Sequence, residues 1–305
     1  MKIRLIDVDG HNFPNLPLMK LSAWHKERGD DVAWYNPLFD WQDIADIVYK
    51  SKVFTFTQDY IYPINAKKIV RGGTGYFYPG GGKRLPDEIE HIYPDYSLYP
   101  EYCQDTAYGF LTRGCPRGCD FCIVESKEGK KSRKVADLSE FWKNQKQIVL
   151  LDPNFFAASE WKDLSEQLIK SNAWIDFSQG CDIRIMTQEK AEYLKRMKIK
   201  RIHFAWDRYQ DKNIIVPKFE EFKRITQWDK RKMSVYVLVN YDTTIEQDLE
   251  RIYILRDLGY WPYVMVFNKE KTKSTDVVRK LQRWVNMRAI FESVPDFEDY
   301  RQVRA

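Results

Sequence analysis

Apolar and polar positions follow two different periods along the first part of the chain, and these periods predict strands and a helix. Runs rich in Ile, Leu and Val are typical of short buried strands. They lie at residues 2–8, 32–35, 44–49 with 53–57, and 68–70. Residues 16–26 carry Leu18, Leu21 and Trp24 at helical spacing, and Gly29 follows as a helix stop. Strands that alternate with a helix indicate a small Rossmann-like α/β domain with a parallel sheet.

The pattern changes character at residues 76–105. This stretch holds three consecutive glycines at residues 80–82, several prolines and many tyrosines. The segment at residues 93–100 has two prolines and is unsuited to a long helix. We expect an irregular linker that packs on a neighbouring domain.

From residue 106 onward a regular alternation returns. The predicted strands are 108–112, 147–151, 174–177, 201–205, 234–239 and 263–267, and the predicted helices are 138–144, 159–170, 187–197, 219–229, 245–258 and 273–285. Six βα units are too few for a closed eight-stranded barrel, so they predict an open, partial barrel with its chemistry at the carboxyl ends of the strands. The predicted domains are 1–75, a linker at 76–105, a barrel at 106–270, and a C-terminal helix and tail at 271–305.

The composition is that of a folded globular protein. Of the 305 residues, 44% are hydrophobic and 30% are charged, and the net charge of +5 neither demands nor excludes a nucleic-acid partner. The basic run at residues 127–134 is typical of a solvated loop. The N-terminal apolar run is too short for a signal peptide or a membrane span, so we expect a cytoplasmic protein with no membrane partner.

Three of the five cysteines lie within eight residues, a poor layout for disulfides and a good one for a metal in a reducing compartment. Cys115, Cys119 and Cys122 are spaced by three residues and then by two. Gly114 and Gly118 allow the loop to turn sharply around one face of a cubic iron–sulfur cluster.

The number of cysteines limits what this loop can hold. A 4Fe-4S cluster usually takes four thiolates, and three leave one iron open to another ligand. A structural zinc site would also need four protein ligands, and the nearest further thiol is Cys103. Zinc is therefore the less favoured interpretation.

The Cys-x3-Cys-x2-Cys spacing, with Phe121 just before the last cysteine, resembles the signature of the radical S-adenosylmethionine superfamily. The resemblance covers roughly residues 106–270. It implies a six-stranded (β/α)6 partial barrel and a 4Fe-4S cluster held by Cys115, Cys119 and Cys122. It also implies reductive cleavage of S-adenosylmethionine to methionine and a 5′-deoxyadenosyl radical. Phe121 would then lie against the adenine, and a reductant such as flavodoxin or ferredoxin would be a partner.

Two polar residues follow the second strand of the predicted barrel. The resemblance implies that acceptors at this position lie near the ammonium group of the cosubstrate, a role that Asp152 and Asn154 could take. The equally favoured alternative is a simple turn around Pro153. The Gly-Gly-Glu version of this segment that is familiar in the family is absent.

Further polar groups follow the third and fourth strands. We expect Arg184 to bind the cosubstrate's carboxylate and Ser178 and Gln179 to contact its ribose. The resemblance implies an acidic residue near the ribose or the substrate after the fourth strand, a position that Asp207 occupies. His203, alone inside a strand, is expected to be a packed residue.

The N-terminal domain resembles a shortened cobalamin-binding domain. The Asp-Gly-His sequence at residues 9–11 ends the first strand, and the two glycines at 72–73 end the fourth. Pro14 stands where the cobalamin motif has glycine, and residues 57–67 are too few for a full crossover. We therefore favour a remnant without cobalamin.

Three functions stay open at this point. The first is a radical enzyme acting on an unidentified small molecule, peptide or nucleic acid. The second is a cobalamin-dependent radical methyltransferase. The third is a nucleic-acid-binding protein with a structural cluster, in which the aromatic linker and the basic loop after Val124 make the contacts.

Overall fold

The computed structural model describes residues 1–301, and the chain divides into two compact units, 1–173 and 174–305. Residues 302–305 of the segment predicted at 271–305 therefore lie outside the described residues. The domain boundaries predicted at residues 75, 105 and 270 stay predictions.

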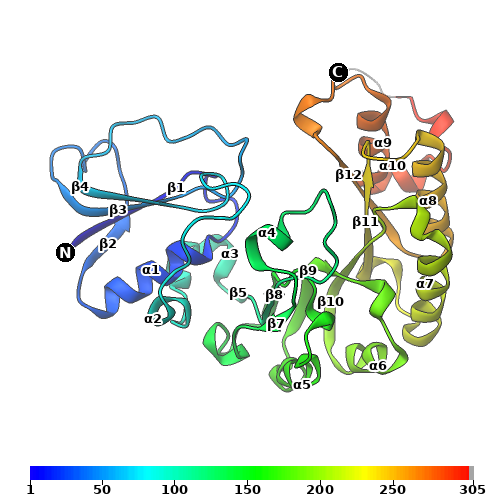
Figure 1. Ribbon diagram of the computed structural model, residues 1–305, viewed down its shortest axis with the longest axis horizontal. Helices are drawn as coiled ribbons and strands as arrows, with labels where there is room; N and C mark the ends of the chain where they lie inside the picture. Colours follow the sequence, from blue (N-terminus) through cyan, green and yellow to red (C-terminus); the bar gives the residue numbers. More distant parts are fainter. Residues whose placement is uncertain (302–305) are drawn as a thin grey trace. The chain divides into compact units, whose positions relative to one another are not determined.

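The first sheet has four strands, all parallel, as predicted (Figure 1). The strands are β1 (Lys2–Asp7), β2 (Asp31–Trp34), β3 (Ala45–Ser51) and β4 (Ala66–Gly72). Their order in the sheet is β2-β1-β3-β4. A predicted continuation of the third strand at residues 53–57 is wrong, because these residues form a loop.

One helix, α1 (Leu16–Glu27), covers this sheet. The Asn15 side chain caps the helix by accepting from the backbone N–H of Leu18. Buried side chains on α1, among them Leu18 and Met19, share one core with Ile3 of β1. The connections β2–β3 and β3–β4 contain no helix. The domain is therefore smaller than an ordinary doubly wound fold.

The irregular stretch after residue 76 is part of the same core. It contains two short helices, α2 (Asp87–Glu90) and α3 (Pro100–Cys103). Ile89, Tyr99 and Cys103 are buried against α1 and β1. Tyr99 is only 2% exposed, so its ring is a packing group and offers no free face for stacking.

The second sheet has six strands in the order β12-β11-β10-β9-β8-β5. The strands are β5 (Thr106–Gly109), β8 (Gln147–Leu150), β9 (Trp174–Cys181), β10 (Lys198–Ala205), β11 (Met233–Val239) and β12 (Trp261–Val266). The pairs β5–β8, β9–β10, β10–β11 and β11–β12 are parallel. A small antiparallel ribbon, β6 (Thr112–Arg113) with β7 (Arg133–Lys134), follows β5.

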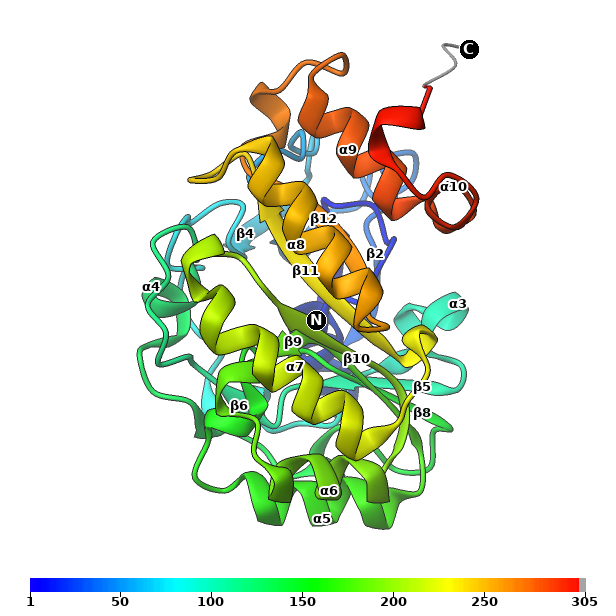
Figure 2. The same cartoon turned by 90° about the vertical axis from the view of Figure 1, so that its right-hand side faces the viewer.

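Helices alternate with most of these strands, as the sequence predicts. They are α4 (Val124–Glu128), α5 (Trp161–Ser171), α6 (Gln188–Arg196), α7 (Lys212–Thr226), α8 (Ile245–Asp257), α9 (Val277–Asn286) and α10 (Arg288–Ser293). In Figure 2, α7 and α8 lie in front of β10 and β11. Within residues 1–301, no helix is long and apolar enough to cross a membrane.

Two predicted helices differ from the structure. The helix predicted at 138–144 is only a 3-10 turn, Leu138–Glu140, because the Gln145 side chain accepts from the backbone N–H groups of Lys143 and Asn144 and holds the chain in a bend. The helix predicted at 219–229 begins earlier, at the start of α7, and tolerates Pro217 inside it.

Candidate active site

Cys115, Cys119 and Cys122 lie on the loop between β6 and α4, beyond the carboxyl end of β5. Cys122 is exposed and the other two are partly exposed, whereas Cys103 and Cys181 are buried, and no cysteine is in a disulfide. The three thiols of the motif are therefore the ones that an external group can reach.

The backbone of this loop depends on Gly114. Its φ is +90°, and a Cβ atom there would lie 2.2 Å from the carbonyl oxygen of Lys131. Next to it, the backbone N–H of Cys115 donates to the carbonyl oxygen of Gly129 at 3.1 Å. Only glycine fits this approach, so the first thiol is positioned by backbone contacts on both sides.

A buried carboxylate, Glu128 at the end of α4, anchors the same loop. It accepts from the backbone N–H of Gly114 at 3.3 Å and from Arg113 Nη1 at 3.1 Å. The Arg113 guanidinium also lies 3.8 Å from the centre of the Phe110 ring. Our sequence interpretation missed Glu128, since an acid on a short helix gives no periodic signal.

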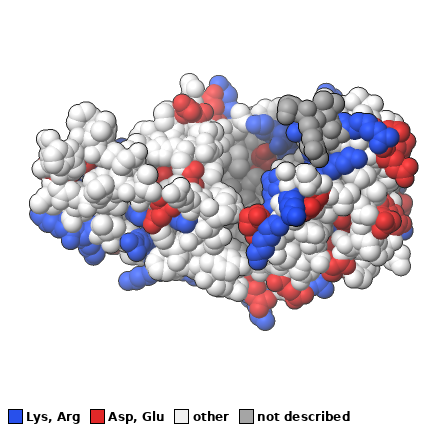
Figure 3. Space-filling view, turned by 90° about the horizontal axis from the view of Figure 1, so that it is seen from above, with Lys and Arg blue, Asp and Glu red and all other residues white. Residues whose placement is uncertain are grey.

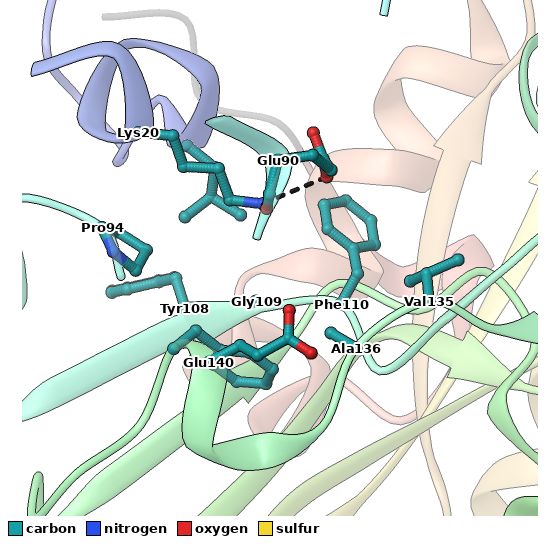
Figure 4. A pocket seen from close by; sticks show the side chains of 11 residues that line it. Lys20, Glu90, Pro94, Tyr108, Gly109, Phe110, Val135, Ala136 and Glu140 are labelled. Carbon is teal, nitrogen blue, oxygen red and sulfur yellow. Dashed lines mark hydrogen bonds and ion pairs between the residues drawn. The ribbon is translucent and has the colours of Figure 1, made fainter. Parts of the chain in front are cut away.

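Arg113 also forms a second ion pair, with Glu90. Glu90 lies 3.6 Å from Arg113 Nη2 and 3.1 Å from Lys20 Nζ. Burial lowers the pKa of Lys20, and the charge of Glu90 opposes this shift. Figure 4 shows the Lys20–Glu90 pair beside a small cavity that Phe110 and Val135 also line. Its volume of about 20 Å³ suits one water molecule, so the cavity is a packing feature.

Asn154 lies beside the first thiol. Its Nδ2 is 3.5 Å from Cys115 Sγ, and its backbone carbonyl accepts from Ser132 Oγ at 3.0 Å. The residue is 2% exposed, and among the described residues its Oδ1 has no hydrogen-bond partner. An unpaired buried acceptor costs stability unless a ligand donates to it.

Asp152 is placed differently. Its carboxylate accepts from the backbone N–H groups of Leu111 and Thr112, at 3.2 and 2.5 Å, and from the Thr112 hydroxyl at 2.7 Å. Burial raises the pKa of Asp152 to about 7 against the effect of these hydrogen bonds. The side chain therefore joins the end of β8 to β6, and its predicted contact with an ammonium group stays a prediction.

The donor set fits an iron–sulfur cluster better than a single ion. Within residues 1–301, no three His, Cys, Asp or Glu side chains are arranged to hold one metal ion. A cubic cluster instead takes each thiolate on a different iron, so the sulfurs need not converge on one point. Three accessible thiols, a glycine that allows close approach and an amide N–H on one sulfur are consistent with such a group.

The second unit contains the remaining predicted residues. Ser178 and Gln179 belong to β9, and Arg184 follows it on a 3-10 turn. Arg184 forms ion pairs with Asp182 at 2.8 Å and with Asp211 at 2.6 Å. Two carboxylates of the chain thus already face the guanidinium that we expected to bind a carboxylate, and its role stays a prediction.

Asp207 follows β10 and is held through its backbone by a fully buried arginine. Arg251 donates to the carbonyl oxygens of Trp206 at 2.7 Å, Asp207 at 2.9 Å and Leu238 at 2.8 Å, and pairs with buried Asp248 at 2.5 Å. Burial raises the pKa of Asp207 to about 6, against the positive charge of Arg251. The sequence did not indicate a role for Arg251, because an arginine on an amphipathic helix is normally expected to face solvent.

The four strands of the second unit have two unlike faces. Toward α7, the side chains are apolar and buried, and Phe204 packs edge to face with Phe219 and Phe222. On the opposite face, the His203 and Tyr236 rings are stacked with centroids 4.9 Å apart and planes 5° apart. Tyr263, which is 43% exposed, meets Tyr236 edge to face.

Two atoms on this polar face are buried without a partner. Among the described residues, neither His203 Nδ1 nor Asp176 Oδ1 has a hydrogen-bond partner, and His203 Nε2 lies 3.9 Å from Asp176 Oδ1. Burial, together with the charge of Arg201, lowers the pKa of His203 to about 4, and burial raises that of Asp176. His203 is buried and packed on Tyr236, as expected, and it also lies beside Asp176.

A four-stranded parallel sheet precedes a six-stranded one, as predicted, and this arrangement is shared with a solved radical S-adenosylmethionine enzyme. The fold is similar to the solved structure of the radical S-adenosylmethionine methyltransferase TsrM from Kitasatospora setae, which contains cobalamin and a [4Fe-4S] cluster. The TM-score is 0.57 over 87% of this chain and 74% of that chain, at 12% sequence identity. No protein-family profile matches the sequence, and no curated protein matches it. At this identity, the likeness concerns the fold.

Proposed function

We propose that this protein is a radical S-adenosylmethionine enzyme that holds a 4Fe-4S cluster through Cys115, Cys119 and Cys122. The observation that carries the proposal is a loop of three accessible thiols, locked by Gly114, on a fold shared with a radical enzyme. When bound, the cluster supplies the electron for reductive cleavage of S-adenosylmethionine.

The chain's own residues bind and orient the reactants in this proposal. Asn154 donates its N–H to the Cys115 sulfur, and its buried Oδ1 is left to accept from a ligand such as the cosubstrate's ammonium group. Glu128 and Arg113 keep the loop in place. Such contacts around a metal ligand typically affect activity about 10- to 100-fold.

We further propose that the polar face of β9–β12 binds the substrate. A parallel sheet is normally covered on both faces, and here one face presents stacked rings and unpaired polar atoms. Asp176 Oδ1 would accept a hydrogen bond from the substrate, and neutral His203 would donate or accept at Nδ1 according to its tautomer.

The proposal includes no cobalamin, because hydrogen bonds tie together the loops that follow β1, β3 and β4, where a corrin ring would need space. The Asp9 carboxylate accepts from the backbone N–H groups of Val53 at 2.6 Å and Phe54 at 3.3 Å, and so bridges β1 to β3. The backbone N–H of Gly75 donates to the carbonyl oxygen of Lys52 at 2.8 Å and links the loops after β3 and β4. Protein from cobalamin-supplemented cells is expected to lack corrinoid absorbance, and its presence would refute this point.

The test is anaerobic. The cluster is reconstituted, dithionite and S-adenosylmethionine are added, and iron, sulfide and 5′-deoxyadenosine are measured. We expect about four irons per chain and formation of 5′-deoxyadenosine. A colourless, iron-free protein, or an intact cluster that yields no 5′-deoxyadenosine, would overturn the proposal.

Variants test the cysteine loop of the first unit and the polar face of the second separately. Alanine at Cys115, Cys119 or Cys122 is expected to abolish both iron loading and cleavage, whereas Cys181→Ala, which removes a buried thiol, keeps both. Asp176→Asn is expected to keep iron and the cleavage seen without substrate. Loss of iron in Asp176→Asn would show that Asp176 supports the fold and does not bind the substrate.

A further inference from the structure

Three cations of the first sheet surround one aromatic ring. Lys50 Nζ, Lys52 Nζ and the Arg71 guanidinium lie 5.4, 5.8 and 5.8 Å from the centre of the Tyr76 ring. Asp59 pairs with Lys50 at 2.9 Å and accepts from the Tyr76 hydroxyl. Asp59 is therefore paired with one of the three cations that lie near this ring.

Two of these cations lie on paired strands, and Lys52 directly follows β3. Lys50 of β3 and Arg71 of β4 are direct partners in the sheet register. Like charges placed opposite each other repel, which is unfavourable unless an anion lies between them. The carboxyl ends of parallel strands are also the edge at which such sheets bind ligands.

Lys52 is the second, independent sign of a ligand. The residue is 9% exposed, and its ammonium has no hydrogen bond or ion pair within the described part of the chain. Its stem is covered by the loop after β4, because a Cβ at Gly75 would lie 2.4 Å from Lys52 Cγ. A mostly buried lysine whose ammonium pairs with no carboxylate of the chain can pair with an anion from outside it.

The segment around these cations, residues 50–84, carries a large excess of positive charge. Residues 50–84 contain a single acid, Asp59. Their basic residues are Lys50, Lys52, Lys67, Lys68, Arg71, Lys83 and Arg84. The excess is therefore six positive charges in a chain whose total is only +5. A field of this sign attracts phosphate groups.

Exposed aromatic rings follow the same two strands. Phe54 and Phe56 follow β3, with centroids 5.1 Å and planes 15° apart, and Phe56 is 74% exposed. Phe77 and Tyr78 follow β4 and are 45% and 62% exposed. At the left of Figure 3, where the first sheet and its loops lie, the surface is largely uncharged, with Lys and Arg along its lower border.

We propose that the carboxyl edge of β3 and β4 binds the phosphate of a nucleotide, either free or within a single-stranded nucleic acid. Lys50, Lys52 and Arg71 hold the phosphate, and the exposed rings stack on bases. A membrane surface would also favour basic and aromatic groups. The nucleotide is favoured because the lysine stems are buried and the cations are fixed around one ring.

This inference goes beyond the proposed function and does not depend on it. Binding is measured on the whole protein without reduction of any cluster. A failure here leaves the proposed radical chemistry untouched, and a failure to cleave S-adenosylmethionine leaves this site untouched.

The test is fluorescence anisotropy of a labelled oligothymidylate at several salt concentrations. Lys52→Met and Arg71→Gln are each expected to weaken binding about tenfold and to reduce the salt slope by about 0.7 for each lost phosphate contact. Phe56→Ala is expected to weaken binding about tenfold by loss of stacking. Competition by AMP as strong as that by the oligomer would identify a free nucleotide as the ligand, and weaker competition would identify a strand.

Matched controls keep the proposal falsifiable. Lys146→Met removes an exposed lysine of the same unit that pairs with Asp105, and Leu38→Ala removes an apolar side chain as exposed as Phe56. Both are expected to bind like the wild type. Arg71 and Phe56 are exposed, so their variants remain informative if Lys52→Met does not fold. Absence of binding at low salt, equal effects in the controls, or binding only to anionic phosphatidylglycerol vesicles would each overturn the proposal.

Discussion

The cysteine loop of the first unit and the polar strand face of the second are built in opposite ways. The loop is a contiguous segment in which Gly114 and short backbone hydrogen bonds position the thiols. The polar face is assembled from Asp176, His203 and Tyr236, which lie on three strands. The first depends on local backbone geometry and the second on strand register.

This difference predicts which substitutions disrupt each region. A single added Cβ atom at Gly114 is expected to disable the loop and leave the rest of the fold intact. The polar face and the strand ends beside it instead depend on buried side chains such as Arg251, which link elements far apart in the sequence. Variants in the two regions should therefore separate loss of iron from loss of stability.

The largest effect is expected from Arg251→Met. The substitution leaves buried Asp248 without its partner and three backbone carbonyls without a donor, which is expected to lower the free energy of unfolding by about 3–5 kcal/mol. Arg231→Met, which breaks an exposed pair with Asp229, is the control and should leave the free energy of unfolding nearly unchanged. Chemical denaturation of both variants checks this, and equal effects would contradict the role of Arg251.

Gly114→Ala should act locally. Its Cβ would collide with the Lys131 carbonyl and its φ of +90° is unfavourable for alanine, with a cost of about 1–3 kcal/mol. We expect loss of iron after reconstitution with the rest of the fold retained. Gly80→Ala, where nothing lies within 4 Å of the added Cβ, is the control and should load iron normally. Normal iron content in Gly114→Ala would show that the loop tolerates a different backbone.

The pH dependence of stability tests the polar face. The pKa of His203 is about 4 in the folded protein and 6.5 in the unfolded chain, so the fold favours the neutral ring. The free energy of unfolding is therefore highest above pH 6.5 and falls as the pH is lowered toward 4. His203→Phe should therefore gain up to about 3 kcal/mol relative to the wild type between pH 6.5 and 4. Denaturation across this pH range measures it. Tyr236→Phe keeps the histidine, so its free energy of unfolding should depend on pH as in the wild type. If the free energy of unfolding of His203→Phe also depends on pH as in the wild type, the lowered pKa of His203 is refuted.

The smallest effect in these two regions is expected from Asn154→Ala. It removes the N–H at Cys115 Sγ and the unpaired Oδ1 but none of the thiols. Cleavage of S-adenosylmethionine is expected to fall about tenfold with iron content unchanged. Ser132→Ala, which removes only the hydrogen bond to the Asn154 backbone, should have a weaker effect on the same assay. Loss of iron in Asn154→Ala would instead make this residue part of the loop's support.

Much of the fold could be predicted because strands and helices leave periodic signals. The strands at residues 2–8, 147–151 and 234–239 were predicted to within a residue or two. The helix at 138–144 could not be excluded from its pattern, because the Gln145 side chain that bends this segment competes with the helix through specific hydrogen bonds.

The sequence by itself determined the three cysteines, the glycine before them and the alternation of strands and helices, since all of these are expressed in short-range spacing. Only the tertiary structure decided that Glu128 anchors the loop, that Asp176 and His203 share a face, and that three cations surround Tyr76. The physical reason is that such groupings depend on the register between strands and on loop closure. Both are set by packing between distant segments and leave no local period in the chain.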